Sequence, residues 1–294
     1  MKVKFILPLI LMSTLLFSCQ DENKKKDLAE VESSAESDFD YNVEEFADIK
    51  ILRYQIPGFE DLTLKEQKLV YYLTQAGLSG RDIMWDQNYR HNLEIRDALE
   101  NIYANYSGDK ESEDWKNFET YIKRVWFSNG IHHHYSNDKI KPEFSKEYFD
   151  TLLADTKIEL TGEPYEVIFN DKDSKKVNLD PNKGLLEGSA INFYGPDVTA
   201  AEAEAFYKKK SSPNKDKPLS YGLNSTLVKE DGKLVEKVWK SGGLYGDAID
   251  EIVKWLEKAI GVAENEKQAN ALGLLIKYYQ TGDLKLGTII MLLG

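Results

Sequence analysis

Cysteine and histidine are scarce in this 294-residue sequence, which contains one cysteine, Cys19, and four histidines. A single thiol excludes an intrachain disulfide and any zinc site built from several thiolates. Three of the histidines are adjacent, at residues 132–134, so a zinc motif with two histidines on one helix has very few candidates. Basic residues are outnumbered, with 38 lysines and arginines against 50 acidic residues and a formal net charge of −12. This balance argues against a nucleic-acid partner, because nucleic-acid binders neutralise phosphates with basic surface.

Motifs that carry enzymatic chemistry are missing as well. The 294 residues contain no H-E-x-x-H, no H-x-E accompanied by thiolates, no G-x-S-x-G and no glycine-rich phosphate loop. A cysteine nucleophile is excluded because Cys19 belongs to the leader segment described next. The sequence therefore offers no catalytic residue and no metal ligand set.

Residues 1–18 have the pattern of a bacterial lipoprotein signal peptide. Two lysines precede a mostly apolar run at residues 5–17, which is shorter than the ~20 residues of a membrane span. The run ends in Leu-Phe-Ser-Cys, similar to a loose lipobox in which Cys19 becomes the lipid-bearing first residue. An ordinary signal peptide with an incidental cysteine is the alternative. Lipidation predicts a protein anchored to a membrane of the bacterial cell envelope, on the periplasmic or outer-membrane face.

The rest of the chain divides by composition into three segments. Residues 19–46 are polar and charged, which predicts a flexible, lipid-anchored tether. Residues 47–285 have the apolar periodicity of a folded lobe. Residues 286–294 (LGTIIMLLG) form an atypical apolar tail without charge. The tail is either a natural end of the domain, a stop inside a larger fold, or the product of a reading frame that changes near Lys285.

The apolar pattern of the lobe predicts an α+β fold. The helical N-terminal part is followed by a small antiparallel or mixed sheet, or a partial barrel, flanked by helices. Thr63 and Glu66 form a capping box at the start of the first helix, and Thr199 and Glu202 form another. Further helices are predicted by apolar spacing at residues 92–106, 113–127, 145–154, 247–260 and 264–279.

Strands are predicted from β-branched and aromatic runs. Residues 165–169 and 190–194 are two such runs. Residues 219–228 and 233–239 flank Asp231-Gly232, the strongest hairpin signal in the chain. The lysine-rich stretch at residues 208–217 is expected to be a solvated loop.

The cluster of histidines at residues 132–134 follows the third predicted helix. Adjacent residues on a helix point apart, so three imidazoles cannot bind one metal there. In an extended segment His132 and His134 share a face and could chelate a metal weakly. A structural polar loop and a loop that contacts a peptide are the alternatives. His91, at the start of the second predicted helix, is expected to cap it.

Two stretches of the sequence resemble a known family. One is LVYYLTQAGLSGRDIMWDQN at residues 69–88, and the more specific one is VWFSNGIHHHY at residues 125–135. Residues 46–54 and 57–62 fit the same pattern, and a fainter similarity continues to about residue 283. Together they resemble the N-terminal portion of a bacterial dipeptidyl peptidase III, a zinc metallopeptidase.

The resemblance implies a two-lobed exopeptidase that releases dipeptides from the N-terminus of short peptides. Its zinc is held on a helical lobe by H-E-x-x-G-H and a later E-E-x-R-A-E/D motif, across a cleft from an α/β lobe with a small barrel. This sequence contains neither motif. We therefore expect an N-terminal fragment truncated before the zinc motif and inactive alone, with zinc a cofactor of the full-length family only.

Substrate contact is the part of the family's site that the resemblance transfers to this chain. The loop at residues 128–137 is expected at the cleft, where Asn129, His134 and Tyr135 bind the N-terminus or backbone of a short peptide. The alternative is a protein of another class, a stand-alone peptide-binding lipoprotein of the envelope that kept this lobe without the catalytic one.

Overall fold

The structure, a computed structural model, describes residues 39–172, 174–210 and 219–293. The predicted signal peptide, Cys19, most of the predicted tether and the end of the lysine-rich loop lie outside the described residues. Contacts divide the chain into two units, one with residues 1–45 and 49–54 and the other with residues 46–48 and 55–294. Each unit is considered by itself.

A two-stranded sheet belongs to the first unit, apart from its residue Phe46. Its strands are β1 (Asn42–Phe46) and β2 (Ile49–Leu52). Beyond the strands, the backbone N–H of Arg53 donates to Tyr41 O at 2.9 Å, and Arg53 Nε donates to Asp40 O at 2.8 Å. Residues 42–46 were assigned to the tether from their composition, yet they form a strand, because β2 supplies the hydrogen-bond partners that composition does not reveal.

The second unit begins with helices. These are α2 (Leu64–Ser79), α3 (Arg81–Asn88), α4 (Asn92–Asn105), α5 (Glu113–Ser128), α6 (Lys146–Thr156) and α7 (Glu163–Phe169). The capping box predicted at Thr63 is present, since its hydroxyl accepts from the N–H of Glu66 and the Glu66 carboxylate accepts from the N–H of Thr63. Gly80 ends α2. Helix α3 begins directly after it and was not predicted.

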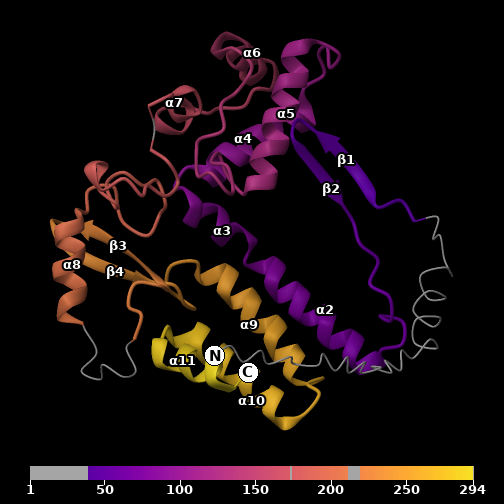
Figure 1. Cartoon of the computed structure of the whole chain (residues 1–294), viewed down its shortest axis with the longest axis vertical. Helices are drawn as coiled ribbons and strands as arrows, with labels where there is room; N and C mark the ends of the chain where they lie inside the picture. Colours follow the sequence, from indigo (N-terminus) through magenta and orange to yellow (C-terminus); the bar gives the residue numbers. More distant parts are fainter. Residues whose placement is uncertain (1–38, 173, 211–218, 294) are drawn as a thin grey trace, which may run out of the picture. The chain divides into compact units, whose positions relative to one another are not determined.

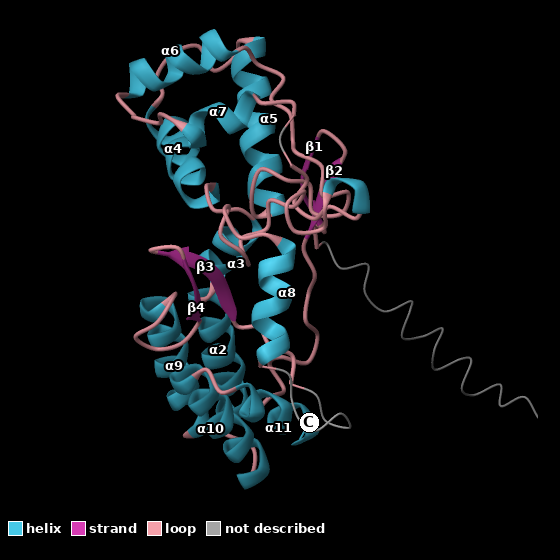
Figure 2. Cartoon of the chain, turned by 90° about the vertical axis from the view of Figure 1, so that its left-hand side faces the viewer, coloured by secondary structure: helices cyan, strands magenta, loops and turns pink. Residues whose placement is uncertain are grey.

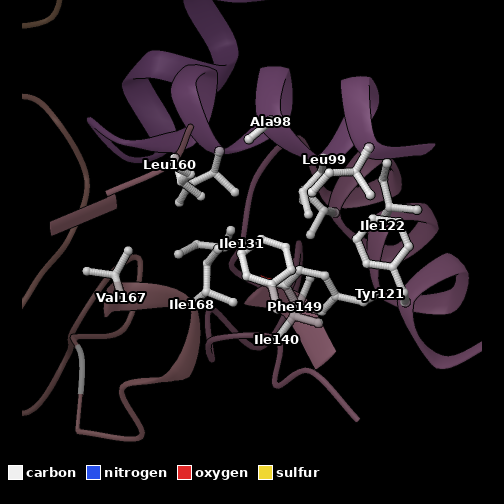
Figure 3. Packing of buried hydrophobic residues seen from close by; sticks show 14 of the residues in the cluster. Ala98, Leu99, Tyr121, Ile122, Ile131, Ile140, Phe149, Leu160, Val167 and Ile168 are labelled. Atoms are coloured by element: carbon white, nitrogen blue, oxygen red, sulfur yellow. The ribbon is translucent and has the colours of Figure 1, made fainter. Parts of the chain in front are cut away.

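Helices α4 to α7 enclose the largest core. Its fully buried side chains include Leu99 from α4, Ile122 from α5, Phe149 from α6 and Ile168 from α7. Figure 3 shows these side chains packed against one another, together with Ile131 and Ile140 from the segment between α5 and α6. Each helix therefore buries one apolar face in a shared interior.

The two strands predicted from apolar runs are wrong. Residues 165–169 lie in α7, where Pro164, Val167 and Ile168 are buried at the three- and four-residue spacing of a helix. Residues 190–194 form no strand. They make isolated bridges to other segments, such as the parallel bridge between Tyr194 and Leu227. The misassigned runs are β-branched and aromatic, and packing in the core overrides that local preference.

The predicted hairpin is confirmed. Strands β3 (Ser225–Glu230) and β4 (Lys233–Val238) pair antiparallel, and Glu230 lies opposite Lys233. The two linking residues, Asp231 and Gly232, have φ values of 50° and 74°, the left-handed conformation of a two-residue hairpin turn.

The C-terminal half contains four more helices and a short 3₁₀ helix. They are η1 (Pro181–Lys183), α8 (Ala200–Lys209), α9 (Gly246–Ile260), α10 (Glu266–Thr281) and α11 (Leu284–Leu293). A second core lies between α2, α9 and α10, and α8 packs in a smaller cluster with Leu227 of β3. Helix α9 lies beside α2 and α10, as Figures 1 and 2 show. The predicted apolar tail forms most of α11, which packs on α10. The fold is α+β, as expected, and the described residues contain two-stranded sheets but no closed barrel.

No helix within residues 39–172, 174–210 and 219–293 combines the length and apolar character that a bilayer span requires.

The buried hydroxyl of Tyr121 allows the energetics of the first core to be tested by mutation. Tyr121 is 2% exposed, and its hydroxyl has no hydrogen-bond partner in the described part of the chain. Burial raises its pKa. Because an unpaired buried hydroxyl costs free energy, Tyr121→Phe should raise the free energy of unfolding by about 1 kcal/mol in urea denaturation.

Tyr165→Phe is the matched control. The Tyr165 hydroxyl donates to the Asp150 carboxylate, so its removal should not stabilise the protein. A lower stability for Tyr121→Phe would show that its hydroxyl is satisfied.

Candidate functional site

The three adjacent histidines lie on a short folded loop, which we call the histidine loop (residues 131–140). Its arms pair through Ile140 N–H to Ile131 O at 2.8 Å and His133 N–H to Asp138 O at 2.7 Å. At the tip, His133 Nδ1 accepts from the backbone N–H groups of Tyr135 and Ser136 at 3.2 and 3.1 Å. The loop is thus ordered by its own backbone and by one imidazole.

Asn92 attaches this loop to the helices. Its side chain is 1% exposed, and its Nδ2 donates to Trp85 O at 2.9 Å while its Oδ1 accepts from Ile131 N–H at 3.1 Å. The neighbouring Gly130 has a φ of 142°, and a Cβ there would lie 2.2 Å from Asn92 Nδ2. Only glycine combines this backbone conformation with so close an approach.

The three histidines have different surroundings. His132 is 2% exposed, and its Nε2 donates to Ser174 O at 3.0 Å. His134 lies with its ring 4.9 Å from that of Phe127, and its pKa is lowered by burial, with His133 and Lys176 adding to the effect. The described residues contain no group of three or more His, Cys, Asp or Glu side chains placed to hold a metal ion.

The residues predicted to contact peptide lie at the surface end of the loop. The rings of His134 and Tyr135 lie 4.7 Å apart, and Tyr135 is 85% exposed. Asn129 is exposed and ends α5 in a left-handed conformation, and its carbonyl accepts from Asn88 Nδ2 at 3.0 Å. The structure therefore joins His134 and Tyr135 in one exposed aromatic cluster with Phe127. The role of all three predicted residues in peptide contact stays a prediction.

His91 was expected to cap α4. It occupies the position before the helix but makes no side-chain capping bond. Its Nε2 instead lies 3.4 Å from a carboxylate oxygen of Glu163. Glu163 lines a cavity, described next.

This cavity of about 460 Å³, which we call the Arg90 cavity, has a charged wall. Arg90 forms an ion pair with Glu163, and its guanidinium lies over the ring of Tyr89. Partial burial opposes ionisation of Glu163, but Arg90 and His91 lower its pKa overall. The cavity thus presents one cation and one carboxylate side by side.

The lining of this cavity also contains exposed apolar side chains. Leu179 and Leu185 are 80% and 59% exposed, and both line the cavity. The connection between them contains η1 and is held by Asn178, whose buried amide donates to Asp180 O at 2.9 Å and Gly184 O at 2.8 Å. A cavity of this size that combines a charged pair with apolar side chains is typical of small-ligand sites.

The Arg90 cavity and the histidine loop are contiguous. The ring of Tyr89 lines the cavity and meets the ring of His132 edge-on, with centroids 5.3 Å apart. Sequence reasoning missed Arg90, Glu163 and Tyr194 as lining residues, because they come from separate segments and form no local motif. No signal in the sequence could have joined them.

A polar network holds Asn192, another lining residue of this cavity. Asn192 lines the cavity, and its Nδ2 donates to Asp86 Oδ2 at 3.1 Å. The Tyr245 hydroxyl donates to the same oxygen at 2.5 Å, and burial together with Asp86 raises the pKa of Tyr245. Asp86 on α3 therefore ties the cavity to the start of α9.

Comparisons with known proteins give matches among solved structures. The chain is similar to a structure of dipeptidyl peptidase III from Caldithrix abyssi, with 22% identity and a TM-score of 0.44 over 78% of this chain and 33% of that chain. It is also similar to a structure of dipeptidyl-peptidase III from Corallococcus sp. strain EGB, with 16% identity and a TM-score of 0.49 over 80% of this chain and 34% of that chain. No family model and no curated protein matches.

The chain spans about a third of the length of those two structures.

Substitution of Gly130 tests the close contact between the histidine loop and Asn92. Gly130→Ala would place a methyl group against the Asn92 amide and strain the backbone, so we expect the free energy of unfolding to fall by about 2 kcal/mol. Urea denaturation measures the change.

Gly77→Ala is the matched control. Gly77 lies within α2 with open space at its Cβ position, so alanine there should be neutral or stabilising. Equal stability of Gly130→Ala and the unmodified protein would contradict the close approach to Asn92.

Proposed function

We propose that this chain binds short peptides, using the Arg90 cavity and the adjoining histidine loop, as one lobe of a dipeptidyl peptidase III-like protein. The observation that carries the proposal is that the Arg90–Glu163 pair and the exposed leucines Leu179 and Leu185 line the same cavity, of about 460 Å³. A short peptide offers the complementary groups, since it has two charged ends, amides and apolar side chains.

The charged wall suits the ends of a peptide. The Arg90 guanidinium can pair with a carboxylate and Glu163 with an ammonium group, and both side chains are reachable, being 34% and 56% exposed. A ligand that carries both charges replaces the ion pair without leaving either group unpaired. The leucines then cover the apolar side chains of the ligand.

The exposed aromatic cluster supports the proposal from the loop side. Tyr135 and His134 project rigid rings that bury area at low cost in conformational entropy. In this proposal they contact the part of the peptide that extends out of the cavity, and Asn129 contributes polar contacts beside them.

Hydrolysis is not assigned to this chain. Its 294 residues lack H-E-x-x-G-H and E-E-x-R-A-E/D, the motifs that hold zinc in the family that residues 69–88 and 125–135 resemble. We propose that zinc chemistry belongs to the full-length family. A stand-alone peptide-binding lipoprotein of the envelope is the second candidate, because the described residues already form a site with ligand-binding chemistry.

Peptide binding is tested by calorimetric titration with tetraalanine. We expect Arg90→Gln to weaken binding about tenfold, or ~1.4 kcal/mol, because a charge-assisted hydrogen bond is lost. Arg81→Gln is the matched control, since Arg81 is exposed on α3 and, within the described part of the chain, pairs with the adjacent Asp82 alone, at 3.4 Å.

Two outcomes would refute the peptide proposal. One is a protein that does not bind tetraalanine, and the other is an equal loss of affinity in both arginine variants. In parallel, incubation with zinc and a dipeptidyl-arylamide measures hydrolysis. Stoichiometric zinc with zinc-dependent release of the arylamine product would show that this chain is active by itself.

We also propose that Cys19 carries a lipid that anchors the protein in the bacterial envelope. The apolar run at residues 5–17 followed by the sole cysteine supports this proposal. Mass spectrometry of the protein expressed in a bacterium should show a lipid-modified N-terminal cysteine, and Cys19→Ser should abolish both the modification and recovery with membranes. An unmodified Cys19 in the mature protein is the contrary result.

A further inference from the structure

A cavity of about 520 Å³ lies among helices α2, α3, α9 and α10, and we call it the apolar cavity. The buried part of its lining includes Ala76 from α2 and Ile249, Ile252 and Leu256 from α9, which are at most 8% exposed. These four side chains belong to the second core. The apolar cavity is therefore a place where the second core is open to a ligand.

Large apolar side chains are exposed around this buried surface. Leu73 of α2 is 40% exposed, Met84 of α3 is 53% exposed, and Leu223, which precedes β3, is 65% exposed. A single exposed apolar residue needs no explanation, but here three from separate segments line one cavity. Such a concentration of exposed apolar surface is typical of a binding site.

Two glycines of α2 explain why the cavity is not filled. Gly77 and Gly80 both line it. A Cβ on Gly80 would lie 3.2 Å from Ile252 Cδ1, so this glycine lets the end of α2 approach α9 closely. A Cβ on Gly77 would have no atom within 4 Å. The space beside Gly77 is thus left open because α2 has no side chain at that position.

The lining of the apolar cavity carries no charge. None of the described residues that line it is Asp, Glu, Lys, Arg or His, although 30% of the sequence is charged. Among its polar side chains, Asn224 is 6% exposed and donates from Nδ2 to Gly282 O at 2.9 Å. Gln87 and Tyr279 contribute an amide and a hydroxyl group to the lining. A charged ligand would be costly here, since its charge would lose water without gaining an opposite charge.

We propose that the apolar cavity binds an uncharged, largely apolar small molecule. Its volume lies within the range of about 300–1,000 Å³ that is usual for small-ligand sites, and its lining has their usual composition of apolar and aromatic side chains with few polar groups. The ligand removes the surface of Leu73, Met84 and Leu223 from water, and a hydrogen-bonding group on it pairs with the Gln87 amide or the Tyr279 hydroxyl. This site goes beyond the proposed peptide binding, because the apolar cavity and the Arg90 cavity share no lining residue.

Fluorescence titration of the full chain with N-phenyl-1-naphthylamine, an uncharged apolar probe, tests the proposal. We expect saturable binding that Gly77→Leu weakens by about tenfold or more, because leucine takes the space of about two methylene groups of the ligand. Gly77→Leu should fold, since leucine is a better helix former than glycine. The matched control is Gly273→Leu. Gly273 lies in α10 with equally open space at its Cβ position but outside the cavity lining, so affinity should stay within about twofold.

A second pair of variants tests the requirement for an uncharged lining. Met84→Glu introduces a carboxylate into the cavity and should also weaken binding by about tenfold or more. Leu78→Glu is its control, because Leu78 is 58% exposed on α2 and does not line the cavity. Urea denaturation establishes that each variant folds. Arg90→Gln should leave probe binding intact, which separates this site from the peptide site.

The sulfonated analogue of the probe, anilinonaphthalene sulfonate, tests the class of ligand. Any binding of this anion should be insensitive to Gly77→Leu. The proposal is overturned if the uncharged probe does not bind saturably, if the cavity and control variants lose affinity equally, or if Gly77→Leu weakens both probes equally. A dimer in analytical ultracentrifugation that Gly77→Leu dissociates, without probe binding, would instead assign the cavity to a second copy of the chain and would likewise overturn it.

Discussion

The side chain of Asn92 is the interaction on which the candidate site depends. A buried amide is costly unless its donors and acceptor are satisfied. Here the amide bonds the end of α3 through Trp85 O and the start of the histidine loop through Ile131 N–H, while its own backbone begins α4. One residue thereby sets the relative position of two helices and a loop. These hydrogen bonds of Asn92 require a glycine at position 130, because no side chain fits between the loop and this amide.

The placement of the charged wall follows from the same junction. Tyr89, Arg90 and His91 form the short connection between α3 and α4, so fixing both helix ends also fixes the direction of these side chains. Tyr89 contacts the rings of both His91 and His132. Elsewhere in the lining, Asn192 is held by Asp86, which also accepts from Tyr245. Hydrogen bonds to Asn92 and Asp86 therefore position residues that line the Arg90 cavity.

The sequence by itself determined the features that depend on near neighbours. The capping boxes at Thr63 and Thr199 and the turn at Asp231-Gly232 are present as predicted, because each is specified by residues within a few positions. Tertiary structure decided the rest. It made residues 163–169 a helix through burial of Val167 and Ile168, and it buried His132 while leaving Tyr135 exposed. It also assembled the Arg90 cavity from distant segments. The physical reason is that hydrogen bonds within a turn need only local chain geometry, whereas burial and the convergence of charges require the packing of the whole fold.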